Sequence, residues 1–415
     1  MKSARFYALD VFRGATVALM ILVNNPGSWS HIYEPLEHAE WNGLTPTDLV
    51  FPFFLFAVGN AMAFVMPRFV AAGDAAFWKK VLRRSLLIFG IGLFLNWWPF
   101  VRWQDNQLLP NGWTWWAPVQ AAVAGIREGA DQLFGIRLLG VLQRIAICYL
   151  VASVLVYYLK PRGAMLAGMI ILLVYWGLCF ALGDYTMPGF FGNHLDESVL
   201  GVPHMYNRET WEGVPQVFDP EGLASTLPAV TQVIFGYLVG DYIIKNAKQL
   251  GDADPQAALY RTLTGLFITA VGLLAAGYMW SLVFPVNKRI WTSSYVVTTT
   301  GMAILVLCTL LYAIELRGIR GGWTRFFDVF GKNALFVFAL SAFLPRGLRL
   351  IRIPNGVNEQ GAPVYTNPWN FIYDKVYKFV PGDERLGSLL FALTVIAFMW
   401  AVCYWLDRKK IYIKV

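Results

Sequence analysis

Apolar stretches long enough to cross a membrane recur along the whole chain, with short polar connectors between them. A helix needs about 20 predominantly apolar residues to cross the hydrocarbon core of a bilayer. The stretches predict ten helices, at about 9–24, 46–66, 80–97, 136–159, 163–182, 226–244, 258–283, 293–314, 326–345 and 387–406. The pattern therefore predicts an all-α, polytopic integral membrane bundle that forms a single domain over residues 1–415.

Composition supports this interpretation and excludes a soluble protein. Hydrophobic residues make up 57% of the chain and charged residues only 14%. The first apolar stretch is interpreted as a retained span, because Asp10 and Arg13 interrupt its start and no small-residue cleavage site follows. The four cysteines lie inside predicted helices without CxxC spacing, so neither a disulfide framework nor a metal site is expected.

Positive charge indicates how the bundle is oriented. If the N-terminus is cytoplasmic, the inside segments collect most of the 34 Lys and Arg residues, including the 408–410 tail. An excess of Lys and Arg marks cytoplasmic segments. We therefore expect both termini in the cytoplasm and four long outer loops, at about 25–45, 98–135, 183–225 and 346–386. No internal repeat is evident, which weakly disfavours a secondary transporter.

The strongest local signal is the segment 38–52, which runs from the first outer loop into the second span. Histidine exchanges a proton near neutral pH, so His38 is a candidate general base, although a loop histidine can also serve only local hydrogen bonding. Thr45 and Asp48 can cap the following helix. A carboxylate so close to hydrocarbon also needs a partner, and Asp48 therefore marks this segment as a candidate site.

Other polar groups lie at the outer ends of predicted spans. We expect them to surround, together with His38, one outer cavity that we call the vestibule. Asn24 and Asn25 close the first span, where an amide can stabilise an oxyanion or simply end the helix. The segments 219–223 and 285–291 also end near spans on the outer side. Together with the segment that follows His38, they supply the expected acceptor-binding residues, which are Trp41, Asn42, Asp48, Asn287 and Lys288.

Four polar residues inside predicted spans call for partners. Asp10 and Arg13 are spaced to contact one another on a helix. Gln143 and Arg144 interrupt the fourth span, and Arg144 has no opposite charge in its own helix. Such charges are costly in lipid unless paired, and a phosphate-bearing ligand is one candidate partner.

Tryptophan is concentrated in the third-to-fourth loop. Aromatic faces can carry sugar rings, but tryptophan also gathers at membrane interfaces, and the interface interpretation is favoured. The residues concerned are Trp97, Trp98, Trp103, Trp113, Trp115 and Trp116.

Several ordered motifs resemble those of the heparan-alpha-glucosaminide N-acetyltransferases and their bacterial relatives in the transmembrane acyltransferase superfamily. The similarity covers nearly the whole chain. The motifs that carry it are Leu9-Asp10-Val11-Phe12-Arg13-Gly14, the His38 to Pro52 segment, Gly140-Val141-Leu142-Gln143-Arg144, Asp219-Pro220-Glu221-Gly222 and Pro285-Val286-Asn287-Lys288.

The resemblance implies a reaction. Acetyl-CoA would be taken from the cytosolic side and the acetyl group passed to a glucosamine amine outside. Independently of the resemblance, the donor phosphates need cationic or polar partners inside the bundle, and we expect Arg13, Arg144 and Gln143 to hold them. His38 matches the catalytic histidine of the family, and Asn24 looks like its catalytic asparagine. The animal enzymes carry a soluble lumenal domain ahead of these spans, so the resemblance implies a smaller amino sugar than a heparan chain as acceptor.

The resemblance leaves alternatives for both the mechanism of transfer and the function. A direct ternary transfer and a covalent acetyl-histidine use the same residues. Some bacterial relatives are labelled as transporters linked to N-acetylglucosamine use, so an amino-sugar transporter is the alternative function. The expected partners are acetyl-CoA, the amino sugar and the lipid bilayer of a bacterial inner membrane, with no nucleic acid and no metal; a homodimer is compatible with this reading.

Overall fold

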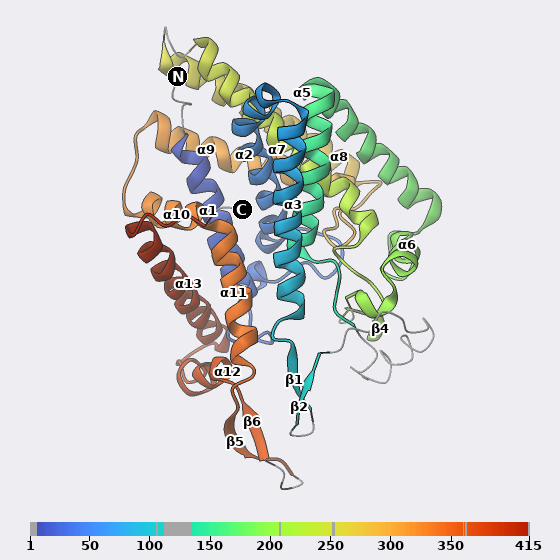
Figure 1. The fold of residues 1–415 in the computed structure, drawn as a ribbon, viewed down its shortest axis with the longest axis vertical. Coiled ribbons are helices and arrows are strands. Elements are labelled where there is room, and N and C mark those ends of the chain that lie inside the picture. Colours follow the sequence, from blue (N-terminus) through green and yellow to red (C-terminus); the bar gives the residue numbers. More distant parts are fainter. Residues whose placement is uncertain are drawn as a thin grey trace.

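The computed structural model describes residues 6–104, 107–111, 135–206, 209–250, 254–359, 361 and 363–413. Helices form most of this part of the chain and stand side by side as a bundle (Figure 1). Their bounds are α1 Tyr7–Asn24, α2 Val50–Ala72, α3 Asp74–Trp97, α5 Val141–Leu182, α6 Gly192–Val199, α7 Leu223–Leu250, α8 Pro255–Ser281, α9 Ser293–Leu310, α10 Gly322–Lys332, α11 Ala334–Leu348, α12 Pro368–Ile372 and α13 Glu384–Arg408. The prediction of an all-α, multi-pass membrane protein is confirmed.

Short elements extend or join these helices. Single turns of 3-10 helix are η1 Glu34–Leu36, η2 Pro46–Leu49 and η4 Val202–His204, and π-helical turns are η5 Leu311–Leu316 and η6 Tyr373–Tyr377. Three antiparallel hairpins pair β1 Val101–Gln104 with β2 Gln107–Pro110, β3 Glu209–Trp211 with β4 Val214–Gln216, and β5 Ile353–Val357 with β6 Pro363–Thr366.

The hairpins gather at one end of the bundle, and the N-terminus lies toward the other (Figure 1). We call these the hairpin end and the opposite end. All three hairpins fall in loops predicted to face outward, so the sequence interpretation puts the hairpin end outside. Sidedness itself stays a prediction.

A helix occupies each predicted range, but the count of membrane-spanning helices differs from the ten expected. Seven helices among the described residues are long and apolar enough to cross a membrane, or eight if the bent pair α10 and α11 is one span. Two of the predicted spans lie within α5, which is broken at Lys160, where φ is 58°. The chain reverses there, and the second half of α5 returns toward α6 (Figure 1). The other predicted span that is not counted is α3, because Lys80, Arg83 and Arg84 lie among its apolar residues.

The predicted single helix at 326–345 is wrong. It forms two helices, α10 and α11, which meet at Asn333 with a bend of 78°. The Asn333 side chain holds the C-terminal tail, donating to the carbonyl of Ile411 at 3.3 Å and accepting from the amide of Ile413 at 2.9 Å. Since these are contacts between segments far apart in sequence, local periodicity could not reveal the bend.

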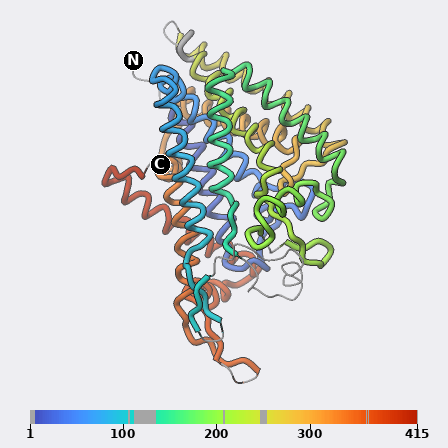
Figure 2. Tube along the Cα trace, turned by 45° about the vertical axis from the view of Figure 1, so that its right-hand side comes forward, coloured from blue at the N-terminus to red at the C-terminus, as the bar shows by residue number. Residues whose placement is uncertain are grey.

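Close helix packing positions the site. The helices α2 and α7 approach so closely that a Cβ at Gly59 would meet the Val233 carbonyl oxygen at 2.0 Å, and one at Gly236 would meet that of Phe56 at 2.1 Å. The helices α3 and α5 run side by side along the bundle in both views (Figures 1 and 2). Their packing carries the segment before α5 to the hairpin end, where the loops converge.

Candidate active site

A cavity of about 350 Å³ opens at the hairpin end and contains His38; we call it the His38 cavity. Its wall comes from the first long loop, η2, the segment before α5, β3, and the segments before α7 and α9. The lining residues are Trp29, His38, Ala39, Trp41, Asp48, Arg137, Val141, Tyr206, Glu209, Pro220, Glu221, Lys288, Arg289 and Trp291. The expected vestibule therefore exists, and it gathers five separate stretches of sequence.

His38 and Asp48 form a hydrogen-bonded pair in this cavity. The Nδ1 atom of His38 lies 2.7 Å from Oδ1 of Asp48. The Asp48 side chain is 1% exposed, whereas that of His38 is 43% exposed. Because a carboxylate only accepts, this contact places a hydrogen on Nδ1 and the lone pair on Nε2, the atom that can accept a proton.

Hydrogen bonds from residues nearby in the sequence fix the position of the Asp48 side chain. Its Oδ2 accepts from the backbone amides of Ala39 at 3.0 Å and Thr45 at 3.2 Å, and from the Thr45 hydroxyl at 3.0 Å. These bonds form a capping box at the start of η2. Asp48 thus caps the helix and orients His38 at once.

Lys288 completes a charged group of three. Its Nζ lies 2.9 Å from Nδ1 and 3.3 Å from Nε2 of His38, and 3.4 Å from Oδ1 of Asp48. Burial lowers the pKa of the Lys288 ammonium, against the attraction of Asp48 and Glu221. The Lys288 amino group is therefore held beside the proton-accepting residue, in contact with the Asp48 carboxylate.

Asn287 forms hydrogen bonds through both ends of its side-chain amide. It is fully buried, its Oδ1 accepts from the Ile290 amide at 3.0 Å, and its Nδ2 donates to Oδ1 of Asn42 at 3.2 Å. Neither asparagine lines the His38 cavity. Asn42 and Asn287 tie the Lys288 turn to the His38 loop, and their expected contact with the acceptor stays a prediction.

Trp41 does line the cavity, as expected of an acceptor-binding residue. Its indole Nε1 donates to the carbonyl of Tyr185 at 2.8 Å, and its ring meets those of Trp211 and Phe218 edge to face. The ring is thereby fixed, so it can offer a rigid apolar wall to a sugar.

Two carboxylates opposite His38 share one arginine. Arg137 Nε donates to Asp219 Oδ2 at 3.0 Å, and its Nη2 contacts both Asp219 Oδ1 and Glu221 Oε2. Although burial opposes the charge, Glu221 and Asp219 together raise the pKa of Arg137. Burial works against ionisation of Glu221 too, yet Arg137 and Arg144 hold its pKa below the ordinary value.

Arg144 belongs to this end of the bundle. Its Nη2 donates to the Gly222 carbonyl at 3.2 Å and contacts the Ser225 hydroxyl, and its guanidinium lies 5.1 Å from the Trp291 ring centre. It is 1% exposed, and neighbouring Gln143 is equally buried. Arg144 and Gln143 therefore lie far from Arg13, which is toward the opposite end, and a role of these residues in binding the donor stays a prediction.

The electrostatics of the cavity keep His38 neutral. Burial lowers its pKa below the ordinary 6.5, the charges of Lys288 and Arg289 act in the same direction, and Asp48 opposes them. A neutral imidazole near pH 7 is the form that accepts a proton.

Asn24 is not brought to His38. It is exposed at the end of α1 and does not line the His38 cavity, while buried Asn25 donates to the Ile21 carbonyl at 2.9 Å and closes the helix. The oxyanion role expected of Asn24 therefore stays a prediction that its position does not favour. The group near His38 that could take the oxyanion role instead is the Lys288 amino group.

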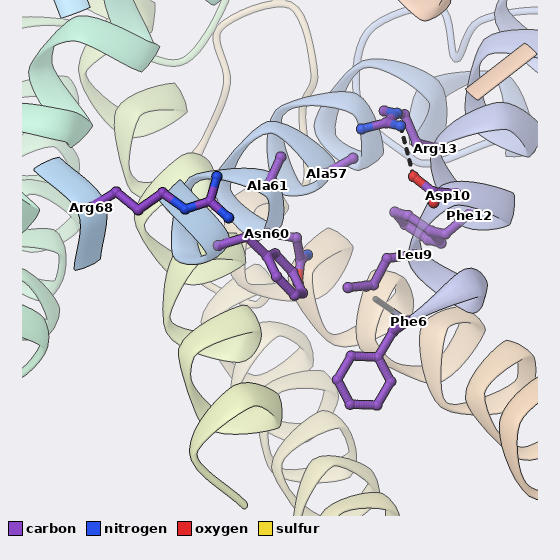
Figure 3. Close-up of a pocket in the computed structure, with 10 residues that line it drawn as sticks. Phe6, Leu9, Asp10, Phe12, Arg13, Ala57, Asn60, Ala61 and Arg68 are labelled. Atoms are coloured by element: carbon purple, nitrogen blue, oxygen red, sulfur yellow. Dashed lines mark hydrogen bonds and ion pairs between the residues drawn. The ribbon is translucent and has the colours of Figure 1, made fainter. Parts of the chain in front are cut away.

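A second cavity, of about 430 Å³, lies between α1 and α2 toward the opposite end (Figure 3). Arg13 stands at one side, where its Nη2 bonds Asp10 at 2.8 Å and its Nε donates to the Gly331 carbonyl at 2.8 Å. The predicted Asp10 to Arg13 contact is confirmed. Arg68 and Asn60 line the other side, and Oδ1 of buried Asn60 has no hydrogen-bond partner among the described residues. We call this the Arg68 cavity.

Sequence reasoning missed Arg137, Arg68 and Trp291. Arg137 could have been sought as the counter-charge of the Asp219 to Glu221 motif, and Arg68 as the last charge of the second span. Nothing in the pattern singled out Trp291. The tryptophans Trp113, Trp115 and Trp116 lie outside the described residues, whereas Trp97, Trp98 and Trp103 lie at the hairpin end of α3 and on β1.

Comparison with known proteins agrees with the motifs. The chain is 25% identical to the heparan-alpha-glucosaminide N-acetyltransferase of Homo sapiens, over 99% of this chain and 60% of that protein. It is 24% identical to the protein of the same name from Mus musculus, over 80% of this chain and 53% of that protein. The chain thus spans little more than half the length of these relatives. No family model matches it. The chain is thus similar to these heparan-alpha-glucosaminide N-acetyltransferases along most of its length.

Proposed function

We propose that this protein is a transmembrane acetyltransferase that moves an acetyl group from acetyl-CoA to the amine of a glucosamine-type sugar. The observation that carries the proposal is the His38 and Asp48 pair, held beside Lys288 in a cavity at the hairpin end. The names of the two relatives support the reaction class. A bacterial inner membrane, with the hairpin end outside, is part of the proposal.

The chemistry follows from the lone pair on Nε2 of His38. The acceptor arrives as an ammonium and must first lose one proton to water to become nucleophilic. Its nitrogen then attacks the thioester carbon, Nε2 takes the second proton, and the C–S bond breaks as the amide forms. His38 returns its proton to the sulfur, so CoA leaves as a thiol. Lys288 is the cation that stabilises the tetrahedral oxyanion.

The donor would enter from the Arg68 cavity. Arg13 and Arg68 supply cations suited to the nucleotide phosphates, and the apolar wall suits the pantetheine arm. Asp48 and Arg68 lie on the continuous η2 and α2 segment, 20 positions apart in the sequence. That separation gives a rise of about 30 Å, close to the thickness of a hydrocarbon core. The two cavities thus suit a donor and an acceptor on opposite sides.

Acetyl-CoA should stabilise the purified protein against thermal unfolding. A ligand that binds only the folded state adds RT ln(1 + [L]/Kd), about 2.7 kcal/mol at 100 times Kd. Replacing Arg68 with glutamine should shrink this stabilisation at a fixed acetyl-CoA concentration. Arg162→Gln, an exposed arginine at the break in α5, is the matched control and should leave it unchanged.

The opposite result would favour the alternative function. If no acyl-CoA stabilises the protein and reconstituted vesicles accumulate an amino sugar, the chain is a transporter. Equal stabilisation of wild type and Arg68→Gln would leave an acetyltransferase but remove Arg68 from the donor site.

The pH dependence of acetyl transfer tests the charge at Lys288. Because the pKa of His38 is lowered, its neutral form should persist below pH 6.5, and the acid limb of kcat/KM should lie there. Lys288→Met removes a positive charge that lowers this pKa, so the limb should move to higher pH. Lys375→Met, on the exposed surface of η6, is the control. An acid limb that stays in place in Lys288→Met would contradict the electrostatic role.

A further inference from the structure

The Arg68 cavity contains a buried carbonyl oxygen that lacks a hydrogen bond. Asn60 lies on α2, lines this cavity and is only 3% exposed. Its Oδ1 has no hydrogen-bond partner among the described residues. Buried carbonyl oxygens almost always accept a hydrogen bond, because leaving one unpaired out of water is unfavourable. None of the sequence motifs includes Asn60, so the role of this oxygen is open.

The other end of the Asn60 amide fixes its orientation. Its Nδ2 donates to the carbonyl of Phe56, one turn earlier on α2, at 3.1 Å. A flipped amide would set Oδ1 against that carbonyl oxygen, and neither atom can donate. The backbone is held as well, because a Cβ at Gly240 on α7 would meet the backbone carbonyl oxygen of Asn60 at 3.0 Å. Oδ1 is therefore the unpaired end of a rigidly held amide.

The α2 wall of the Arg68 cavity places this amide at a set distance from a cation. Figure 3 shows the Asn60 side chain between Arg68 and Leu9 of α1. Eight positions separate Asn60 from Arg68 on the same helix, a rise of about 12 Å. Arg68 is exposed and forms no ion pair within the part of the chain that the structure describes. The rest of the α2 wall is apolar and is formed by Ala57, Ala61 and Phe64.

The donor carries the group that the Asn60 oxygen lacks. The pantetheine arm of CoA contains two amides, and the one nearer the diphosphate is separated from it by a short hydroxylated carbon chain. With the diphosphate at Arg68, this nearer amide would reach the level of Asn60, and the arm would continue along α2 toward the His38 cavity. An amide N–H donates one hydrogen bond, and a carbonyl oxygen accepts it. The apolar surroundings strengthen such a bond and raise the cost of its absence.

We propose that Asn60 recognises the donor through its pantetheine arm, with Oδ1 accepting a hydrogen bond from the N–H of the amide nearer the diphosphate. Arg68 then holds the phosphates, and Asn60 selects pantetheine thioesters over other acetyl thioesters. This proposal rests on the proposed acetyltransferase function and deepens it, since it names the residue that reads the donor. Asn60 is far from the reacting atoms and acts in binding alone.

The test measures binding to the full-length protein in lipid nanodiscs, without an acceptor. The probes are CoA and two analogues, in which an ester replaces either the nearer or the farther amide. An ester keeps the carbonyl group but loses the N–H. Wild type should bind the nearer-ester analogue roughly ten-fold more weakly than CoA, as expected when a buried acceptor is left unpaired. Asn60→Leu should bind CoA and the nearer-ester analogue equally. The effect of the farther ester should be the same in both proteins.

Asn193→Leu is the matched control. Asn193 on α6 is also buried, its Oδ1 is likewise unpaired among the described residues, and its Nδ2 donates to the Met187 carbonyl at 2.8 Å. It does not line the Arg68 cavity, so its variant should bind all three probes as wild type does.

The outcomes separate this inference from the proposed function. Equal binding of CoA and the nearer-ester analogue by wild type would overturn the role of Asn60, whether or not Asn60→Leu folds. So would an undiminished preference for CoA in Asn60→Leu, and either result leaves the acetyltransferase standing. The expected binding pattern without any acetyl transfer would support the Asn60 contact and overturn the acetyltransferase alone. Failure of wild type to bind CoA would overturn both.

Discussion

Replacing His38 with alanine should lower the rate of acetyl transfer by roughly 10² to 10⁴, the range typical of losing a general base. The lone pair on Nε2 of His38 accepts the amine proton. No other histidine lines the His38 cavity among the described residues. The side chain is 43% exposed, so its removal should cost little stability. The measurement is transfer from labelled acetyl-CoA to a panel of amino sugars, with wild type beside the variant.

A matched control is His31→Ala. His31 lies in the same outer loop but pairs with Glu384, with its Nε2 2.5 Å from Oε2, and does not line the His38 cavity. This control should retain the wild-type rate. Equal rates for wild type and His38→Ala would remove His38 from catalysis, and uptake of amino sugar without any acetylated product would favour a transporter. Thermal stabilisation by acetyl-CoA should survive in His38→Ala, because the Arg68 cavity is untouched.

Arg137→Met should lower the free energy of unfolding by about 3–5 kcal/mol, the range for breaking a buried ion pair by removing one partner. Arg137 is the shared partner of Asp219 and Glu221, and the Asp219 side chain is fully buried. Without the guanidinium, two carboxylates face each other out of water. The measurement is denaturant unfolding of the purified protein in detergent.

A second substitution tests whether charge is the cause. Adding Glu221→Gln to Arg137→Met removes one of the stranded carboxylates, so it should restore part of the lost stability. Arg385→Met breaks an exposed pair with Asp383 instead, and should cost much less stability than Arg137→Met. If Arg137→Met is no more destabilising than Arg385→Met, the cluster does not hold the loops together.

The loop chemistry was predictable only in part. Asp48 was expected to need a partner near hydrocarbon, and the structure supplies His38 at 2.7 Å. The motifs at 219–223 and 285–291 were expected at one vestibule, and their residues do line the His38 cavity. The same reasoning finds no such support for Asn24, because the residue type suits an oxyanion but its place at the end of α1 is outside the cavity wall.

Arg144 shows the limit of chemical matching most clearly. Because a buried arginine suits a phosphate, the sequence predicted that Arg144 and Arg13 hold the donor phosphates together. Its partners are instead the Gly222 carbonyl, the Ser225 hydroxyl and the Trp291 ring, all at the start of α7 and before α9. These contacts join segments about 80 to 150 positions apart, a separation that no periodicity encodes.

The sequence by itself determined the helices and their approximate ends, because lipid requires every backbone polar group to be bonded within a helix and makes long apolar runs unmistakable. It also determined which motifs carry chemistry, since charges near hydrocarbon are costly and rare. Only the tertiary structure decided the bend at Asn333, the sharing of Arg137 by two carboxylates, and which segments line the His38 and Arg68 cavities. These features arise from contacts between distant segments, whose geometry depends on how whole helices pack.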